Sequence, residues 1–205
     1  MAENHRVYTA YCVMLDILKM RGVDVSEYEG FSSNDVARLH AANNMNLLFK
    51  GEGGKKVYLR YELERAPDIH KLADLFFEPN GGEPAVLSSE DDLIIVANDS
   101  ANDSKVDLMN DLWENRGIFM TVVSLDDLQF NKFKAALVPQ SIRILTEEEA
   151  KEVRTKYYIT DNGQFPTISR FDALGVLLGI RPGQLVKVER DSVAALTLDF
   201  YRVCI

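Results

Sequence analysis

Between Leu93 and Val123 the sequence reads LIIVANDSANDSKVDLMNDLWENRGIFMTVV, and this stretch decides the fold of the first part of the chain. Its apolar run Leu93–Ala97 predicts a buried strand. An amphipathic helix is expected at Ser104–Arg116, ended by Gly117, and Ile118–Val123 reads as a second buried strand. A strand, a helix and a strand of these lengths favour parallel pairing with a right-handed crossover. The stretch predicts an α/β domain.

The residues before this unit predict helices and a hairpin. A first helix is expected to start at Asn4 as its cap, and a second after Ser32, which has the capping-box spacing to Asp35. Apolar residues alternate on both sides of Gly51–Gly54, which predicts a β-hairpin rather than a phosphate-binding loop. Pro67 stands where a further helix would have its first residue.

The residues after this unit predict a compact α+β module. Thr146 and Glu149 have the spacing of a capping box, so a helix is expected to follow Thr146. A tight turn is expected at Arg181-Pro182-Gly183, between a short helix that starts at Asp172 and two strands, Leu185–Glu189 and Thr197–Val203.

Charge divides the chain at about the same place. Residues 1–135 hold 14 Lys and Arg against 23 Asp and Glu, whereas residues 136–205 hold nine of each. The excess acid lies between Glu78 and Asp127, so the first part should not bind a DNA duplex tightly by itself. We therefore expect an α/β domain at 1–135 and an α+β module at 136–205.

Composition favours a folded protein inside a cell. The chain has 205 residues, and its two cysteines, Cys12 and Cys204, have neither metal-ligand spacing nor a disulfide framework. The longest apolar run is Leu93–Ala97, far short of the ~20 residues that a membrane helix needs, and no secretory signal is expected. No cofactor and no metal is implied.

The search for catalytic groups leaves one enzymatic alternative. Glu90, Asp91 and Asp92 precede a strand, as the carboxylates of a metal-dependent nuclease would, but a solvated acidic face explains them more simply. The three histidines stand apart from any nucleophile motif, so they are expected at the surface or its margin. We expect no catalytic residue and no metal ligand.

The predicted hairpin carries the one basic and aromatic cluster of the sequence. Lys50, Lys55, Lys56 and Arg60 alternate with aromatic residues, a pattern that suits nucleic-acid contact. Alternation on a β-hairpin explains the same pattern, so both interpretations stay open. These four cations are the candidate DNA contacts.

The last third of the chain resembles a known family. Leu137-Val138-Pro139, the helix opened at Thr146, Phe165-Pro166-Thr167-Ile168, Leu178–Val188 and the closing Tyr201–Ile205 occur in the order and spacing found in the fifth common subunit of eukaryotic-type DNA-directed RNA polymerases. The C-terminal module of that family also stands alone as a small subunit of archaeal RNA polymerase. The resemblance covers about residues 128–205, and the preceding part fits in length and element order.

The chain also departs from the family pattern. Ser141, Thr167 and Ala173 replace the usual His, Arg and Pro, and Ser192–Leu196 replaces a polar loop with apolar residues. The loop change puts the family's contacts there in doubt. Divergence of this kind suggests a large DNA virus as the source.

The resemblance implies a noncatalytic subunit of a multisubunit polymerase. The C-terminal module would dock on the largest subunit, beside other polymerase subunits, and a jaw-like α/β domain would lie near downstream duplex DNA, which it would touch weakly and only within the complex. It would work in the nucleus, or in the virion and infected cell for a virus, and not at a membrane. The partner-contact candidates are Arg181, Pro182, Gly183, Arg190, Tyr201 and Arg202. A free-standing protein-binding adaptor and the nuclease remain as alternatives.

Overall fold

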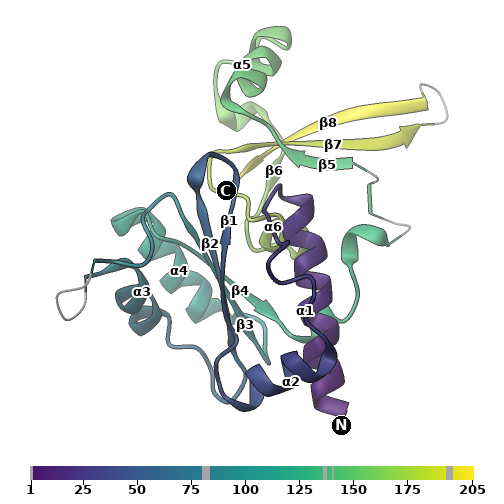
Figure 1. The fold of residues 1–205 in the computed structure, drawn as a ribbon. Coiled ribbons are helices and arrows are strands. Elements are labelled where there is room, and N and C mark those ends of the chain that lie inside the picture. The colour runs from purple at the N-terminus through teal and green to yellow at the C-terminus, as the bar shows by residue number, and fades with distance from the viewer. Residues whose placement is uncertain (1, 80–83, 136–137, 140, 193–195) are drawn as a thin grey trace. The chain divides into compact units, whose positions relative to one another are not determined.

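The computed structural model describes residues 2–79, 84–135, 138–139, 141–192 and 196–205 (Figure 1). Its contacts divide the chain into two compact units, Met1–Asn131 and Lys132–Ile205. The first is an α/β unit and the second an α+β unit, so the predicted fold class is confirmed. Within the described ranges, no helix is long and apolar enough to cross a membrane.

The first unit is built on a mixed four-stranded sheet of order β1-β2-β3-β4. The strands are β1 (Asn46–Lys50), β2 (Lys56–Glu62), β3 (Asp92–Ala97) and β4 (Phe119–Ser124). β1 and β2 form the predicted antiparallel hairpin, and β2, β3 and β4 are parallel. Every residue of β3 and β4 is buried, as expected for strands covered on both faces.

Helices cover this sheet on its two faces. The crossover helices α3 (Ile69–Phe77) and α4 (Asp103–Arg116) lie on one face, and α1 (Ala2–Met20) and α2 (Ser33–Ala41) lie towards the other (Figure 1). Gly117 ends α4 in the left-handed conformation, at φ 64°.

Three expectations about helix starts can now be compared with the structure. The Ser32–Asp35 capping box is confirmed. The Asn4 cap is wrong, because α1 begins at Ala2 and takes Asn4 into its first turn. The expected place of Pro67 is also wrong, because the Asp68 side chain accepts the Lys71 N–H and caps α3, which leaves Pro67 before the helix.

The second unit is a curled sheet of order β5-β7-β8-β6. Its strands are β5 (Ser141–Ile144), β6 (Thr167–Ile168), β7 (Leu185–Ser192) and β8 (Leu196–Cys204). β6 pairs parallel to β8, and the other pairs are antiparallel. The helices are α5 (Glu147–Lys156), which starts at the predicted Thr146–Glu149 capping box, and α6 (Ala173–Leu178).

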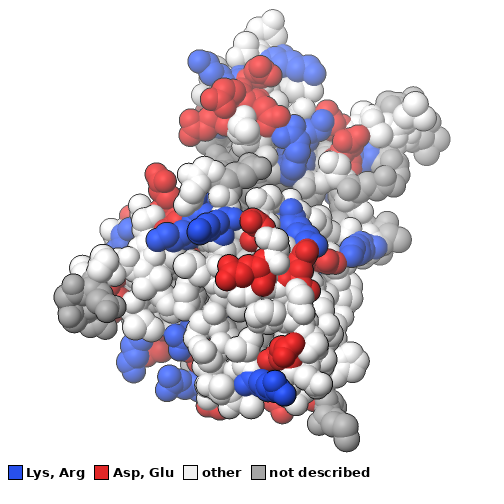
Figure 2. Space-filling model, in the orientation of Figure 1, with Lys and Arg blue, Asp and Glu red and all other residues white. Residues whose placement is uncertain are grey.

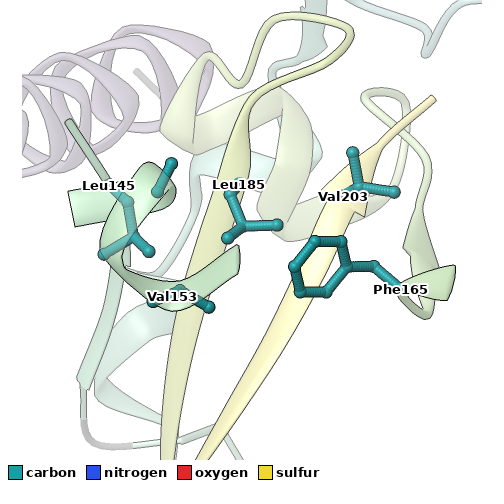
Figure 3. Close-up of a cluster of buried hydrophobic side chains, with 6 residues drawn as sticks. Leu145, Val153, Phe165, Leu185 and Val203 are labelled. Atoms are coloured by element: carbon teal, nitrogen blue, oxygen red, sulfur yellow. The ribbon is translucent and has the colours of Figure 1, made fainter. Parts of the chain in front are cut away.

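Apolar clusters form on both faces of this second sheet because side chains alternate along each strand. Under α5, Leu185 and Val203 pack with Leu145, Val153 and Phe165 (Figure 3). The opposite face is closed by Leu178 and Ile180 from the α6 region, packed on three strand residues: Val186, Val188 and Cys204.

Short 3-10 turns complete the two units. They are η1 (Glu52–Gly54), η2 (Asp126–Leu128), η3 (Lys132–Lys134) and η4 (Asn162–Gln164). η1 forms the connection of the β1–β2 hairpin, where Gly53 and Gly54 take positive φ angles of 70° and 84°. The hairpin interpretation of Gly51–Gly54 is thereby confirmed.

Candidate functional site

Asp92, the central residue of the nuclease alternative, is completely buried at the start of β3. One carboxylate oxygen pairs with the Arg21 guanidinium, and the other lies 2.9 Å from the Lys55 ammonium. Arg21 comes from the turn after α1 and Lys55 from the β1–β2 connection, so Asp92 joins three segments of the unit. Its charge is neutralised inside the fold.

Asp91 is buried beside it and organises the main chain. Its carboxylate accepts the Lys56 N–H and the Ser88 N–H, each at 2.7 Å, and the Ser88 hydroxyl at 2.9 Å. Burial favours a raised pKa for Asp91, but these hydrogen bonds outweigh it and hold the pKa below its ordinary value. Asp91 therefore ties the loop before β3 to the start of β2.

These contacts correct both interpretations of the acidic cluster. A solvated acidic face is wrong for Asp91 and Asp92, because both are buried and paired. The nuclease alternative also loses its carboxylates, because Asp92 is occupied by cations. In the described ranges no group of three or more His, Cys, Asp or Glu side chains could hold a metal ion.

The candidate DNA contacts on the hairpin are largely engaged within the unit. Lys55 pairs with Asp92, and the Lys56 ammonium donates to the Val86 carbonyl at 3.2 Å. The Arg60 Nε–H donates to Glu62 at 2.7 Å. Lys50 is exposed at the end of β1. Lys50 is thus the candidate that the fold leaves facing solvent.

The hairpin aromatic residues are part of the core. Phe49 is buried, and the Tyr58 ring lies 4.5 Å from the Phe76 ring of α3. These rings are already packed, which favours the hairpin explanation of the sequence pattern over base stacking. Figure 2 shows Lys and Arg interspersed with Asp and Glu over the face in view, in agreement with a weak electrostatic attraction for DNA.

The partner-contact candidates lie along β7 and β8 and at the turn before β7. The turn Arg181–Gly183 adjoins the chain end, since the Gly183 N–H donates to the Cys204 carbonyl at 2.9 Å. Gly183 has a φ of 87°, a backbone conformation that glycine adopts without the steric strain that a Cβ atom would cause. The Arg202 guanidinium donates to the Thr167 carbonyl at 2.9 Å and so joins β8 to β6. Arg202 therefore has a structural role.

The two remaining candidates lie on opposite faces of the sheet. Tyr201 packs on the α5 side, with its ring 5.8 Å from that of Tyr157. Arg190 is exposed, and its guanidinium lies 5.6 Å from the centre of the Phe200 ring. Of the six candidates, Arg190 and Gly183 are the exposed ones. The middle of the altered loop, residues 193–195, and Leu137 of the family motif lie outside the described residues.

A row of exposed apolar residues on β8 was not predicted from the sequence. Leu196, Leu198 and Phe200 are 86%, 44% and 46% exposed. They occupy alternate positions of the strand, and this alternation is visible in the sequence. It ordinarily predicts a strand whose apolar face is buried against the core, so exposure was not expected. Among the described residues, the apolar cluster on this face reaches Val188 and Cys204 but not Leu196, Leu198 or Phe200, which only the fold could reveal.

The second unit is the part of the chain that is similar to known proteins. Residues 130–204 match the family model described as RNA polymerase Rpb5, C-terminal domain. The DNA-directed RNA polymerase subunit Rpo5 of Pyrococcus abyssi is 42% identical over 77 residues, which are 38% of this chain and 92% of that protein. Rpo5 of Thermococcus kodakarensis is 39% identical over 77 residues, which are again 38% of this chain and 92% of that protein.

These matches place the chain in the class of RNA polymerase subunits. It belongs to the Rpb5/Rpo5 family, as the sequence motifs predicted. The family match leaves residues 1–129 outside it, and the viral source stays a prediction.

Proposed function

We infer that this chain is a noncatalytic subunit of a multisubunit DNA-directed RNA polymerase. The observation that carries the inference is the 92% coverage of the archaeal relatives by the C-terminal part of this chain. Proteins that consist almost entirely of this module are themselves named polymerase subunits. The module is therefore the part that joins the polymerase, and we propose that it docks on the largest subunit.

The α/β unit has a different role from the C-terminal module. Its excess of acid disfavours binding to DNA on its own. We propose that it forms part of the jaw near downstream duplex DNA, with the β1–β2 hairpin and Lys50 towards the phosphates. Such a subunit would work wherever the polymerase works, in the nucleus or in a virion and the infected cell.

Deletion variants test whether the C-terminal module anchors the chain in the polymerase. A chain without residues 1–131 should enter the polymerase at the normal ratio, because the module carries the docking surface. A chain without residues 132–205 should enter at least tenfold less. The measurement is the amount of the chain per largest subunit in purified polymerase, by quantitative mass spectrometry. The reverse pattern would give the anchor to the α/β unit.

The same assay tests the turn before β7. Arg181→Glu should reduce incorporation through the proposed contact, whereas Gly183→Val should reduce it partly through folding, because φ is 87° there. Normal incorporation of both variants would remove the turn from the docking surface.

Lys50 is tested by the salt dependence of DNA retention. In the assembled polymerase, Lys50→Ala should lower the slope of log affinity against log salt by about one, the effect of one lost phosphate contact. Lys71→Ala, which removes an exposed cation of α3, should leave the slope unchanged. Equal slopes for Lys50→Ala and the unmodified chain would exclude this contact.

The proposed division into domains is also testable. Each unit has its own sheet, and residues 132–205 have their own buried apolar clusters, so this part of the chain should unfold cooperatively in isolation. Limited proteolysis should cleave first near residues 132–141 or 78–92, where few of the described residues belong to a helix or strand. Gradual melting of the isolated module would contradict the division.

A further inference from the structure

A hollow opens on the α/β unit where the loop after β2 leads into α3. Its volume is about 450 Å³. Sites of about 300–1,000 Å³ are large enough to take a small molecule, so this hollow can also take a large side chain of a partner. The residues that line it come from the end of β2, the loop of residues 63–68 and one side of α3.

Part of the lining is apolar. Pro67 and Leu72 are buried, whereas Leu75 of α3 is 45% exposed. Leu72 and Leu75 are three positions apart, so they lie on the same side of the helix. An apolar side chain placed in the hollow would remove Leu75 from water, which is favourable by itself but does not select a ligand.

The charged residues of the hollow leave one cation without a partner. Both carboxylates are engaged: Glu62 accepts the Arg60 Nε–H at 2.7 Å, and Asp68 lies 3.3 Å from the Lys71 ammonium. Arg65, in the loop between β2 and α3, makes no hydrogen bond or ion pair with the part of the chain that the structure describes. The hollow therefore combines apolar surface with one positive charge that is not compensated.

The chemistry of Arg65 limits the ligand to an anion. A guanidinium pairs best with a carboxylate or a phosphate, because its N–H groups form a planar fork. The excess acid of this unit repels a polyanion such as DNA much more than a single carboxylate. Phosphates would also leave the apolar lining unused. A carboxylate next to a large apolar side chain uses both parts of the hollow.

The openness of the hollow indicates a protein segment rather than a free small molecule. Arg65, Ala66 and Lys71 of the lining are all exposed. Such a hollow covers only part of its ligand, whereas sites for free small molecules bury most of the ligand surface. A segment of a longer chain can obtain the remaining affinity from contacts elsewhere.

We propose that this hollow binds an acidic apolar segment of a partner protein, in which an Asp or Glu stands next to a large apolar side chain. The carboxylate pairs with Arg65, and the apolar side chain packs on Leu72 and Leu75. The proposal goes beyond the proposed function, because it concerns the α/β unit alone and can be tested on the free full-length chain.

An NMR titration of the full-length chain with two capped peptides tests the site. The first has the sequence Ser-Glu-Phe-Leu-Gly, and the second has Gln in place of Glu. The Glu peptide should shift the amide signals of Ala66, Lys71 and Leu75 until they saturate. The Gln peptide has nearly the same shape but no charge, so it should bind about fivefold more weakly. Equal affinities of the two peptides would overturn the proposal.

Three variants assign the two parts of the contact. Arg65→Gln should abolish the difference between the peptides, because the carboxylate then has no cation. Leu75→Ala should weaken both peptides by a similar factor, since they share the apolar contact. Lys105→Gln is the matched control: Lys105 lines only a smaller hollow that Arg65 also borders, so the fivefold difference should remain. If the difference survives in Arg65→Gln, another group causes it and the proposal is wrong.

Further probes distinguish other occupants. The capped peptide Ser-Glu-Ser-Ser-Gly keeps the carboxylate but lacks the apolar side chains, so it should bind about tenfold more weakly than the first peptide. Equal binding would reduce the hollow to a general anion site. A duplex DNA oligonucleotide that displaces the Glu peptide would make it a phosphate site, and 3-phenylpropionate that binds as tightly as the peptide would make it a small-molecule site. Each of these results would overturn the proposal.

Discussion

Asp92→Ala should destabilise the α/β unit by about 3–5 kcal/mol, the range for removal of one partner from a buried ion pair. The substitution leaves the Arg21 guanidinium, whose side chain is 9% exposed, without its carboxylate, and also releases Lys55. The loss should appear as a lower urea midpoint. The single Trp113, whose ring lies 5.9 Å from that of Phe119, reports unfolding of this unit by fluorescence.

Asp107→Ala is the matched control for the loss of a negative charge. Asp107 is exposed on α4, so its substitution should change the free energy of unfolding by less than about 0.5 kcal/mol. If Asp92→Ala behaves like this control, the buried carboxylate contributes no more than a surface charge, and our account of the residue is wrong.

Gly175→Ala should destabilise the C-terminal unit by about 3 kcal/mol, at the upper end of the range for overpacked sites. A Cβ at Gly175 would lie 2.6 Å from the Ser169 carbonyl oxygen and 3.1 Å from that of Arg170. Both are main-chain atoms, so they cannot move aside as a side-chain end would. Helix propensity alone predicts the opposite sign, a gain of up to about 1 kcal/mol in α6.

Gly183→Ala is the comparison that separates the steric clash of an added Cβ from the cost of a positive φ. A Cβ at Gly183 has no neighbour within 4 Å, but φ is 87°, so the expected loss is about 1 kcal/mol. Hydrogen exchange of the buried Val186 and Val188 amides of β7 measures the free energy of opening in this unit. A stabilising Gly175→Ala would show that the close approach to Ser169 is relieved at little cost.

Much of the fold could be predicted because its signals are local. The strands and helix within Leu93–Val123, the Gly51–Gly54 hairpin and the Thr146–Glu149 capping box each depend on residues close together in sequence. Hydrophobic period and cap chemistry act over that range. The Pro67 prediction failed for a related reason, because Asp68 beside it offers the stronger cap.

The candidate sites were harder to predict because they depend on distant residues. Arg21 and Lys55 meet Asp92 across 71 and 37 positions of the chain, so no spacing in the sequence shows that this acid is neutralised. Lys55 and Lys56 appeared as free cations for the same reason, since their partners Asp92 and Val86 are distant in the sequence. The effect of a charge depends on what lies within a few Å of it, and tertiary packing decides that.

The sequence by itself determined the family, the two fold classes and the order of the elements, because these depend on local periodicity and ordered motifs. Only the tertiary structure decided which charged residues are available for contact and which edge of the C-terminal sheet is open. β8 reads as an ordinary strand in the sequence, but a strand's edge is open or closed according to its neighbours. Here β6 contributes two residues, which pair with Val203 and Cys204, so among the described residues the rest of β8 has no partner strand on that edge.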